Sequence, residues 1–251
     1  MPFHTINGKQ VYYDIQGQGA PLLMIHGSMS THRVWDKLRT CAKKYALLLL
    51  DLPGHGQSEP LEGDITVQRF AEIVAQLIHK MGHKGIVVMG HSLGGAITLQ
   101  LALDHASLLN RLVLVGTGAK LGVLPAILDG LRTNYQAGIE LAMGQMAFAK
   151  GADLALVEHC KEECLQCPQE VGYTDFLACN NFDVRQRLSE IEVPSLVVVG
   201  DEDKLTPVKW SQYLADHLQN AKLTIIEQAG HMVMLEQPEK LNQAINTFLS
   251  Q

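Results

Sequence analysis

A serine between two glycines is the first feature of the sequence that could carry out covalent chemistry. The pentapeptide G-H-S-L-G at residues 90–94 follows the apolar run Ile86–Gly90 and precedes a segment with helical periodicity. Glycines at both flanking positions avoid collisions with neighbouring backbone in a strained strand-to-helix turn. Such a turn exposes the Ser92 hydroxyl at the edge of a sheet and points the positive end of the next helix toward it. The sequence therefore predicts a nucleophile at Ser92.

A serine hydroxyl is a weak nucleophile at neutral pH, and it needs an adjacent base that an acid holds in place. Three acids, Asp201, Glu202 and Asp203, lie in the loop after the apolar run Ser195–Gly200. His231 follows another apolar run, Leu223–Glu227. The carboxyl ends of parallel strands meet at one edge of a sheet, so we expect His231 and one of the three acids to lie close to Ser92.

Two further loops strengthen this interpretation. D-L-P-G-H-G-Q-S at residues 51–58 follows one predicted strand, and H-G-S at residues 26–28 follows another. Together with the serine turn, these motifs closely resemble the α/β-hydrolase superfamily, in particular a serine carboxylesterase with a small helical cap, and the resemblance covers nearly the whole chain. It implies the chain order Ser, Asp, His, and its G-x-x-D spacing with a proline beyond matches Asp203 rather than Asp201. The implied roles are nucleophile for Ser92, base for His231 and orienting acid for Asp203.

The resemblance also implies a site for the negative oxygen of a tetrahedral intermediate. Two backbone N–H groups form this oxyanion hole in the family, one from the residue after the nucleophile and one from the residue after His-Gly. These residues are Leu93 and Ser28 in this chain. Met29 is the alternative for the second amide, and the Ser28 hydroxyl is a further possible donor.

The elements that must position these residues follow an alternation of short apolar runs with longer helical patterns, which indicates βα units and a mostly parallel sheet. The runs are Pro21–His26, Ala46–Asp51, Ile86–Gly90, Arg111–Val115, Ser195–Gly200 and Leu223–Glu227. Helical periodicity is clearest at Thr66–Met81, Gly95–His105, Pro207–Leu218 and Pro238–Leu249. Before them, residues 4–7 and 10–16 predict a hairpin through Asn7-Gly8. With the resemblance, the expected fold class is α/β, namely an α/β-hydrolase fold with an eight-stranded sheet flanked by helices.

The pattern changes after residue 116, where no convincing β run appears until residue 190. We expect one domain over residues 1–251, with a helical cap inserted at about residues 121–190. An insertion between two parallel strands leaves and re-enters at the carboxyl edge of the sheet, so this cap would roof the site. Met143 and Met146 belong to an apolar series in it that either packs in the core or lines an acyl pocket, and Met29 is a third pocket candidate.

Three cysteines in the predicted cap have the spacing C-x3-C-x2-C, which in another context indicates an iron–sulfur cluster. Here Cys160, Cys164 and Cys167 fall at positions i, i+4 and i+7 of an expected helix, and we interpret them as small apolar packing residues. Zinc binding, with nearby His159 and Cys179, is the alternative. The sequence predicts no metal and no organic cofactor.

Composition excludes several other classes of protein. The 251 residues are 47% hydrophobic and 18% charged, with a net charge of −6 and no basic run, which argues against disorder and nucleic-acid binding. Neither a secretory signal nor an apolar run long enough to span a membrane is evident. Five cysteines without an export signal favour a reducing compartment, so we expect a cytoplasmic protein without a membrane partner.

The expected function is hydrolysis of carboxylic esters of small to medium hydrophobic substrates through an acyl-enzyme. A lactonase, a thioesterase and a carbon–carbon bond hydrolase of the same fold are alternatives. A ligand-binding, receptor-like relative with little turnover is the alternative of another class. The natural substrate and the oligomeric state are left open by the sequence.

Overall fold

A computed structural model describes residues 3–251 of the chain, apart from the side chains of residues 40–43. Its centre is an eight-stranded sheet with the strand order β1-β2-β4-β3-β5-β6-β7-β8. From β4 to β8 in this order, each strand runs parallel to its neighbours, whereas β2 runs antiparallel to both β1 and β4. The strands are β1 (Phe3–Ile6), β2 (Lys9–Gln16), β3 (Ala20–Ile25), β4 (Tyr45–Leu50), β5 (Ile86–His91), β6 (Leu109–Val115), β7 (Ser195–Gly200) and β8 (Ala221–Ile226). The predicted fold class is confirmed.

The edge hairpin has the turn that its sequence demands. Asn7 and Gly8 both have positive φ, at 50° and 80°, as a two-residue hairpin turn requires. In the central strands, alternate side chains enter different apolar clusters. Leu22 and Met24 of β3 join one cluster, and Leu23 and Ile25 join the other. Burial on both faces explains why these strands appear in the sequence as continuous apolar runs.

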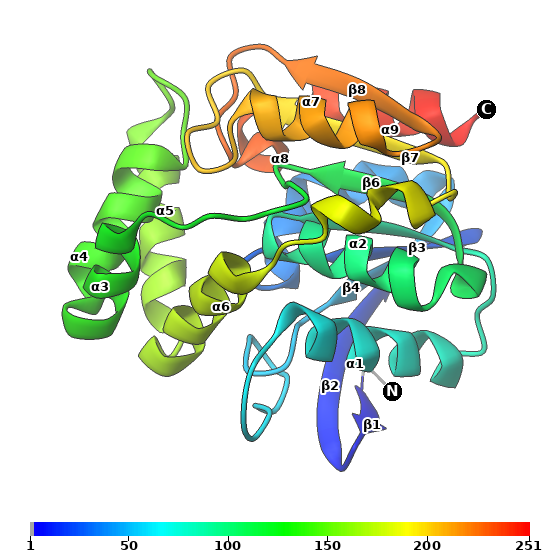
Figure 1. The fold of residues 1–251 in the computed structure, drawn as a ribbon, viewed down its shortest axis with the longest axis horizontal. Helices are drawn as coiled ribbons and strands as arrows, with labels where there is room; N and C mark the ends of the chain where they lie inside the picture. The colour runs from blue at the N-terminus through cyan, green and yellow to red at the C-terminus, as the bar shows by residue number, and fades with distance from the viewer. Residues whose placement is uncertain (1–2) are drawn as a thin grey trace.

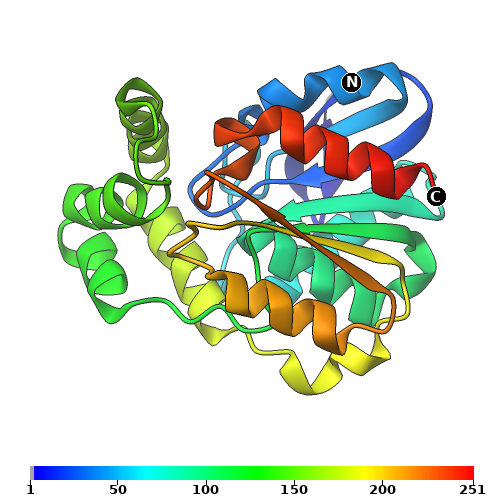
Figure 2. The same cartoon turned by 90° about the horizontal axis from the view of Figure 1, so that it is seen from above.

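Helices cover both faces of this sheet (Figure 2). One face carries α1 (Val67–Lys80), α2 (Leu93–Asp104) and α7 (Val208–His217), whose buried residues belong to one cluster. The other face carries η1 (His32–Lys43), α8 (Val233–Glu236) and α9 (Pro238–Leu249). Thr66 caps α1 by accepting the Arg69 amide, and α9 begins at its proline, as the sequence predicts.

A group of helices projects from one end of the sheet (Figure 1). It lies between β6 and β7 and contains α3 (Pro125–Thr133), α4 (Tyr135–Ile139), η3 (Glu140–Met146), α5 (Leu154–Gln166) and α6 (Gln169–Asn181). The short helix η4 (Arg185–Glu190) follows α6 and packs against α7 of the sheet domain. We call residues 121–190 the cap segment. Within it, α6 packs against both α3 and α2, so it connects the outer helices to the sheet domain. Treating this segment as an insertion into a single domain stays a prediction.

Three details differ from the sequence-based expectations. The 3₁₀ helix η1 was not predicted, because its apolar residues are interrupted by charged ones at short intervals. Helix α5 ends at Gln166, so Cys167 follows the helix instead of sharing its face with Cys160 and Cys164. Strand β8 begins at Ala221, two residues before the predicted run, because its exposed edge carries polar side chains. No helix within residues 3–251 is long and apolar enough to span a membrane.

Candidate active site

Ser92 lies between β5 and α2 in a strained backbone conformation. Its φ of 53° and ψ of −115° are rare for a residue with a side chain, as a sharp strand-to-helix turn requires. The Ser92 amide donates to Val115 O at 3.0 Å, and the Thr117 hydroxyl donates to Ser92 O at 2.9 Å. These two bonds tie the turn to the end of β6. The strain is therefore held by the neighbouring strand.

The two glycines of this turn sit where no side chain fits. A Cβ on Gly90 would lie 2.1 Å from Gly94 O, and a Cβ on Gly94 would lie 2.3 Å from Ile25 O. Both distances are far shorter than any non-bonded contact. The close approach of β3, β5 and α2 at this corner therefore depends on glycine at both positions.

Asp203 and His231 meet at the carboxyl ends of β7 and β8. Asp203 Oδ2 lies 2.9 Å from His231 Nδ1, and both side chains are buried. Asp203 Oδ2 also accepts the Thr206 hydroxyl at 2.7 Å, while Oδ1 accepts the amides of Leu205 at 3.0 Å and Thr206 at 2.8 Å. Burial would raise the pKa of Asp203, but His231 and the Thr206 donors outweigh it and hold that pKa below its ordinary value. The carboxylate therefore stays charged and fixes the imidazole through Nδ1.

The backbone of His231 is held from both sides. Its amide donates to Ala147 O in the cap segment at 2.7 Å, and its carbonyl accepts from His91 Nε2 at 3.0 Å. The Glu236 carboxylate accepts the amides of Gly230 and Ala149, each at 2.9 Å. Loop and cap segment are thus joined around the histidine. The imidazole rings of His91 and His231 are both buried and lie close together. Burial, and then His231, therefore lower the pKa of His91 well below its ordinary value.

Ser92 and His231 line the same cavity, which has a volume of about 760 Å³. Within the described part of the chain, no hydrogen bond joins the Ser92 hydroxyl to the His231 imidazole. Such bonds are often loose in the absence of a substrate, and they tighten when the reacting groups are engaged. The structure thus brings Asp203 into contact with His231 and places Ser92 and His231 in the wall of one cavity. The exposed Asp201 instead accepts the Ala229 amide at 3.3 Å.

The structure distinguishes between the two candidates for the second oxyanion amide. Met29 N–H donates to Asp175 Oδ2 at 3.0 Å, so it is already occupied. Among residues 3–251, neither the Ser28 amide nor the Leu93 amide has a hydrogen-bond acceptor within the protein. Leu93 is the first residue of α2, where backbone N–H groups have no partner inside the helix. The free donors are therefore at Ser28 and Leu93.

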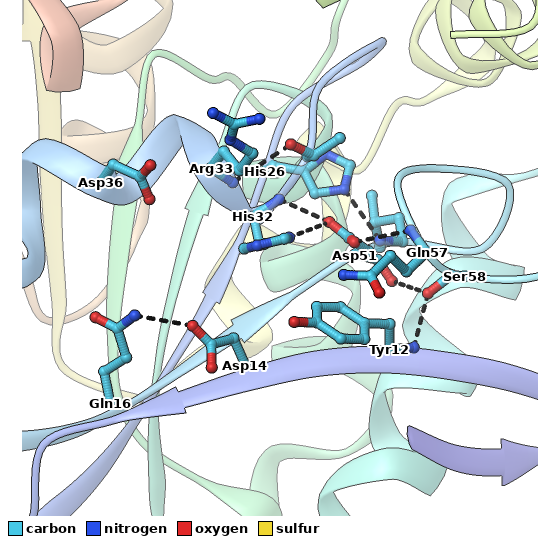
Figure 3. Close-up of polar contacts among 12 residues, drawn as sticks. Tyr12, Asp14, Gln16, His26, His32, Arg33, Asp36, Asp51, Gln57 and Ser58 are labelled. Atoms are coloured by element: carbon cyan, nitrogen blue, oxygen red, sulfur yellow. Dashed lines mark hydrogen bonds and ion pairs between the residues drawn. The ribbon is translucent and has the colours of Figure 1, made fainter. Parts of the chain in front are cut away.

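The loop after β3 and the loop after β4 are joined by a partly buried polar network around Asp51 (Figure 3). Asp51 Oδ1 accepts the amide and ring of His32 at 2.7 and 2.9 Å, and Oδ2 accepts the Gln57 amide at 3.0 Å. These contacts lower the pKa of Asp51, although its burial opposes them. His26 accepts the Leu52 amide on Nε2 at 3.0 Å, and its Nδ1 donates to Gly27 O at 2.7 Å. Burial lowers the pKa of His26 to about 4, so it is a neutral scaffold residue.

The cavity wall combines sulfur-containing and other apolar side chains with polar and charged ones. It includes the three methionines predicted for the pocket, Met29, Met143 and Met146. Cys160, Cys164, Cys167 and Cys179 line it too, all buried free thiols. Burial raises the pKa of Cys160 and of Cys179 to about 12. These two thiols are therefore protonated and are not competing nucleophiles near neutral pH. No group of three metal-ligating side chains gathers anywhere in the described residues.

Sequence reasoning missed several residues that hold the site together. Thr206 supports Asp203 with a hydroxyl and an amide, and it follows the Asp by three residues, so its helix-capping spacing could have identified it. Asp175 contacts Met29 across 146 residues of sequence. No local signal marks that contact, because Asp175 lies inside an ordinary cap helix.

Comparisons with known proteins agree with this geometry. Residues 22–244 match the sequence profile of the Alpha/beta hydrolase family. A solved structure titled "Structure of a thermophilic esterase" is 36% identical, has a TM-score of 0.89, and the match covers 99% of this chain and 96% of that one. An (E)-2-((N-methylformamido)methylene)succinate hydrolase of Acinetobacter baylyi is 27% identical, with 97% of this chain and 95% of the relative covered.

A third relative is a pimeloyl-[acyl-carrier protein] methyl ester esterase of Vibrio vulnificus, which is 26% identical over 95% of this chain and 97% of its own length. The matched length, the strand order and the turn at Ser92 all indicate the same family. The chain belongs to the alpha/beta hydrolase family.

Proposed function

We propose that this protein is a serine esterase that hydrolyses carboxylic esters of small to medium hydrophobic substrates through an acyl-enzyme. The observation that carries the proposal is the 2.9 Å contact between Asp203 Oδ2 and His231 Nδ1 at the cavity that Ser92 also lines. With Nδ1 occupied, the free nitrogen of the ring is Nε2. That nitrogen is the one a serine base uses.

In the proposed reaction, Ser92 Oγ adds to the ester carbonyl carbon while His231 Nε2 takes the hydroxyl proton. The carbonyl oxygen becomes an oxyanion, which the amides of Ser28 and Leu93 are free to bind. The intermediate collapses, the bond to the alcohol oxygen breaks, and His231 returns the proton to that leaving group. Water then repeats the sequence on the acyl-enzyme and releases the carboxylic acid. Asp203 keeps the ring oriented throughout.

The cavity supports the substrate class. A volume of about 760 Å³ is within the range of sites for small molecules, and it suits acyl or alkyl groups of modest length. Thioether and thiol side chains around it adapt to varied apolar shapes. Two similar proteins named as esterases, at 36% and 26% identity, support ester hydrolysis.

The proposal is tested by hydrolysis of p-nitrophenyl acetate, butyrate and octanoate by the full chain, with Ser92→Ala as the matched control. We expect turnover of the short and medium esters that disappears in the variant. A parallel panel of lactones and thioesters identifies a different bond preference. Absence of Ser92-dependent turnover on the whole panel would overturn the proposal and favour a ligand-binding relative.

A further inference from the structure

We infer that Asp175, on cap helix α6, is a positioning residue that holds the backbone of the oxyanion loop in its active shape. The oxyanion loop is here residues 27–29, and the inference rests on the proposed function, because it gives this loop a role in catalysis. Asp175 itself is absent from the cavity wall, so it acts through Met29 rather than on the substrate. It joins the cap segment to the loop that follows β3.

Asp175 makes two buried contacts through one oxygen. Oδ2 accepts the Met29 amide at 3.0 Å and lies 2.8 Å from His55 Nε2. Asp175 has no exposed surface, and Met29 is only 2% exposed. A substitution that removes the acceptor oxygen of Asp175 therefore leaves the Met29 amide without its protein partner.

The Met29 backbone needs such a restraint. Its φ of 55° places the backbone of Met29 in the left-handed region, which residues with a long side chain rarely occupy. The conformation is held by packing as well, since a Cβ on Gly172 of α6 would lie 3.0 Å from Met29 Cγ. Strain of this kind persists only where the surrounding structure holds it, and it concentrates at functional sites.

The restraint on Met29 extends to the proposed oxyanion donor. The Met29 amide belongs to the peptide that directly follows Ser28, so fixing that peptide plane limits rotation of Ser28 and its own free N–H. One helical turn beyond Asp175, Cys179 Sγ lies 3.8 Å from Ser28 Oγ. One face of α6, presenting Gly172, Asp175 and Cys179, therefore contacts both residues after Gly27.

His55 completes the arrangement without offering a second base. Its Nε2 contacts Asp175, and its Nδ1 lies 3.2 Å from Pro53 O, so both ring nitrogens are engaged. Burial opposes its charge, but Asp175 and then Cys167 outweigh this and raise the pKa of His55 well above its ordinary value. The pair is a buried ion pair that secures Asp175 beneath Met29.

Simple packing does not account for this pair. Asp175 Oδ1 is buried without any hydrogen-bond partner among the described residues, which is a costly state for a carboxylate. Apolar residues of similar volume often replace buried ion pairs without loss of stability. Asp175 therefore supplies something that an apolar residue cannot, which is an acceptor for the Met29 amide.

The test compares Asp175→Asn, which keeps an acceptor oxygen, with Asp175→Ala, which does not. Asn180→Ala is the matched control, since Asn180 on the same helix accepts the Val123 amide at 3.2 Å but has no contact with the oxyanion loop. We expect Asp175→Ala to lower kcat by about 10- to 100-fold, less than the loss of an entire donor. Its KM should change by less than about threefold, because ground-state binding is untouched. Asp175→Asn should stay within about fivefold of wild type, since one neutral acceptor replaces a charged one.

A trifluoromethyl ketone provides a readout that a structural role would not change. It adds to the nucleophilic serine and places an oxyanion where the intermediate has one. We expect its inhibition constant for Asp175→Ala to rise by the same factor by which kcat/KM falls, with no such rise in Asn180→Ala. Equal kcat in Asp175→Ala and wild type, or an unchanged inhibition constant, would overturn the inference.

A double variant covers the case in which Asp175→Ala does not fold. Asp175→Leu combined with His55→Leu replaces the ion pair by apolar side chains and still lacks the acceptor. A folded double variant with lowered kcat supports the inference, and one with wild-type kcat overturns it. If wild type itself shows no Ser92-dependent turnover, the proposed function has failed. That result differs from failure of the inference, in which wild type is active and the Asp175 variants are equally active.

Discussion

Two histidines that line the cavity, His231 and His55, each contact a buried aspartate at almost the same distance. Asp203 lies 2.9 Å from His231, and Asp175 lies 2.8 Å from His55. In the first pair the aspartate bonds Nδ1 and leaves Nε2 for Ser92. In the second pair the aspartate bonds Nε2, and Nδ1 is taken by Pro53 O. Both pairs consist of a histidine nitrogen in contact with a carboxylate oxygen. They differ in that only the first pair leaves a ring nitrogen free to act as a base.

The carboxylates of the two pairs also differ in how well they are satisfied. Both oxygens of Asp203 accept hydrogen bonds, including three from Leu205 and Thr206. Asp175 uses one oxygen only, for Met29 and His55. In the proposed mechanism the first arrangement stabilises an imidazolium that forms during the reaction, whereas the second holds a backbone amide. Each pair also connects to the cap segment, the first through Ala147 and the second through α6.

Removal of Ser92, or of His231 from the first pair, should produce the largest effect. Ser92→Ala and His231→Ala should each lower kcat by about 10⁴-fold or more, and the double variant should lose little beyond either one, because the two groups act as a unit. His55→Gln, in the other pair, should cost at most about tenfold, since it contacts no reacting atom. Steady-state kinetics on p-nitrophenyl butyrate measures all four variants. Additive losses at Ser92 and His231 would contradict the shared mechanism.

Asp203→Asn should lower kcat by about 10³- to 10⁴-fold, because an amide no longer fixes the tautomer of the ring or stabilises its charged form. Its effect on KM should be small. Comparison with Asp175→Asn, for which we expect only a small kinetic loss, measures how different the two pairs are. Similar losses at the two positions would remove the functional distinction between them.

The second pair should dominate the pH dependence of stability. The pKa of His55 is raised in the folded state, so its contribution is fully present below the unfolded value near 6.5 and is lost as pH rises through the folded value. Asp175→Asn should lower the free energy of unfolding by about 3–5 kcal/mol near pH 6, with a smaller difference from wild type at alkaline pH. Urea unfolding between pH 6 and 10 measures this gap. Cys167 and His26 also face His55, and Cys167 contributes to its raised pKa, so Asn180→Ala is the control whose gap should stay nearly constant.

The smallest expected effect concerns the support of Asp203. Thr206→Val removes the hydroxyl that donates to Asp203 Oδ2 at 2.7 Å but keeps the amide and the shape of the side chain. We expect kcat to fall by about tenfold, in line with one hydrogen bond to a charged group, and Thr206→Ser to restore most of it. An unchanged kcat in Thr206→Val would show that the two backbone amides suffice.

The sequence predicts these two regions to different extents. The strands β3 to β7 and the hairpin through Asn7 and Gly8 follow from local patterns, because burial and turn geometry restrict which residues fit. Ser92, Asp203 and His231 each lie in the turn or loop that follows a strand, so local motifs place them at one edge of the sheet. The contact from Asp175 to Met29 spans 146 residues, and the packing of the cap segment alone creates it. Which amide of the oxyanion loop is free therefore became visible only in three dimensions.

The proposed function depends most directly on a nucleophilic Ser92 that His231 activates. Incubation of the full chain with a fluorophosphonate probe, followed by peptide mass spectrometry, measures this nucleophile without any choice of substrate. We predict stoichiometric labelling of Ser92 in wild type and in Asn180→Ala, with labelling lost in Ser92→Ala and slowed by several orders of magnitude in His231→Ala. A folded wild-type protein that stays unlabelled, or one labelled at another residue, would contradict the account.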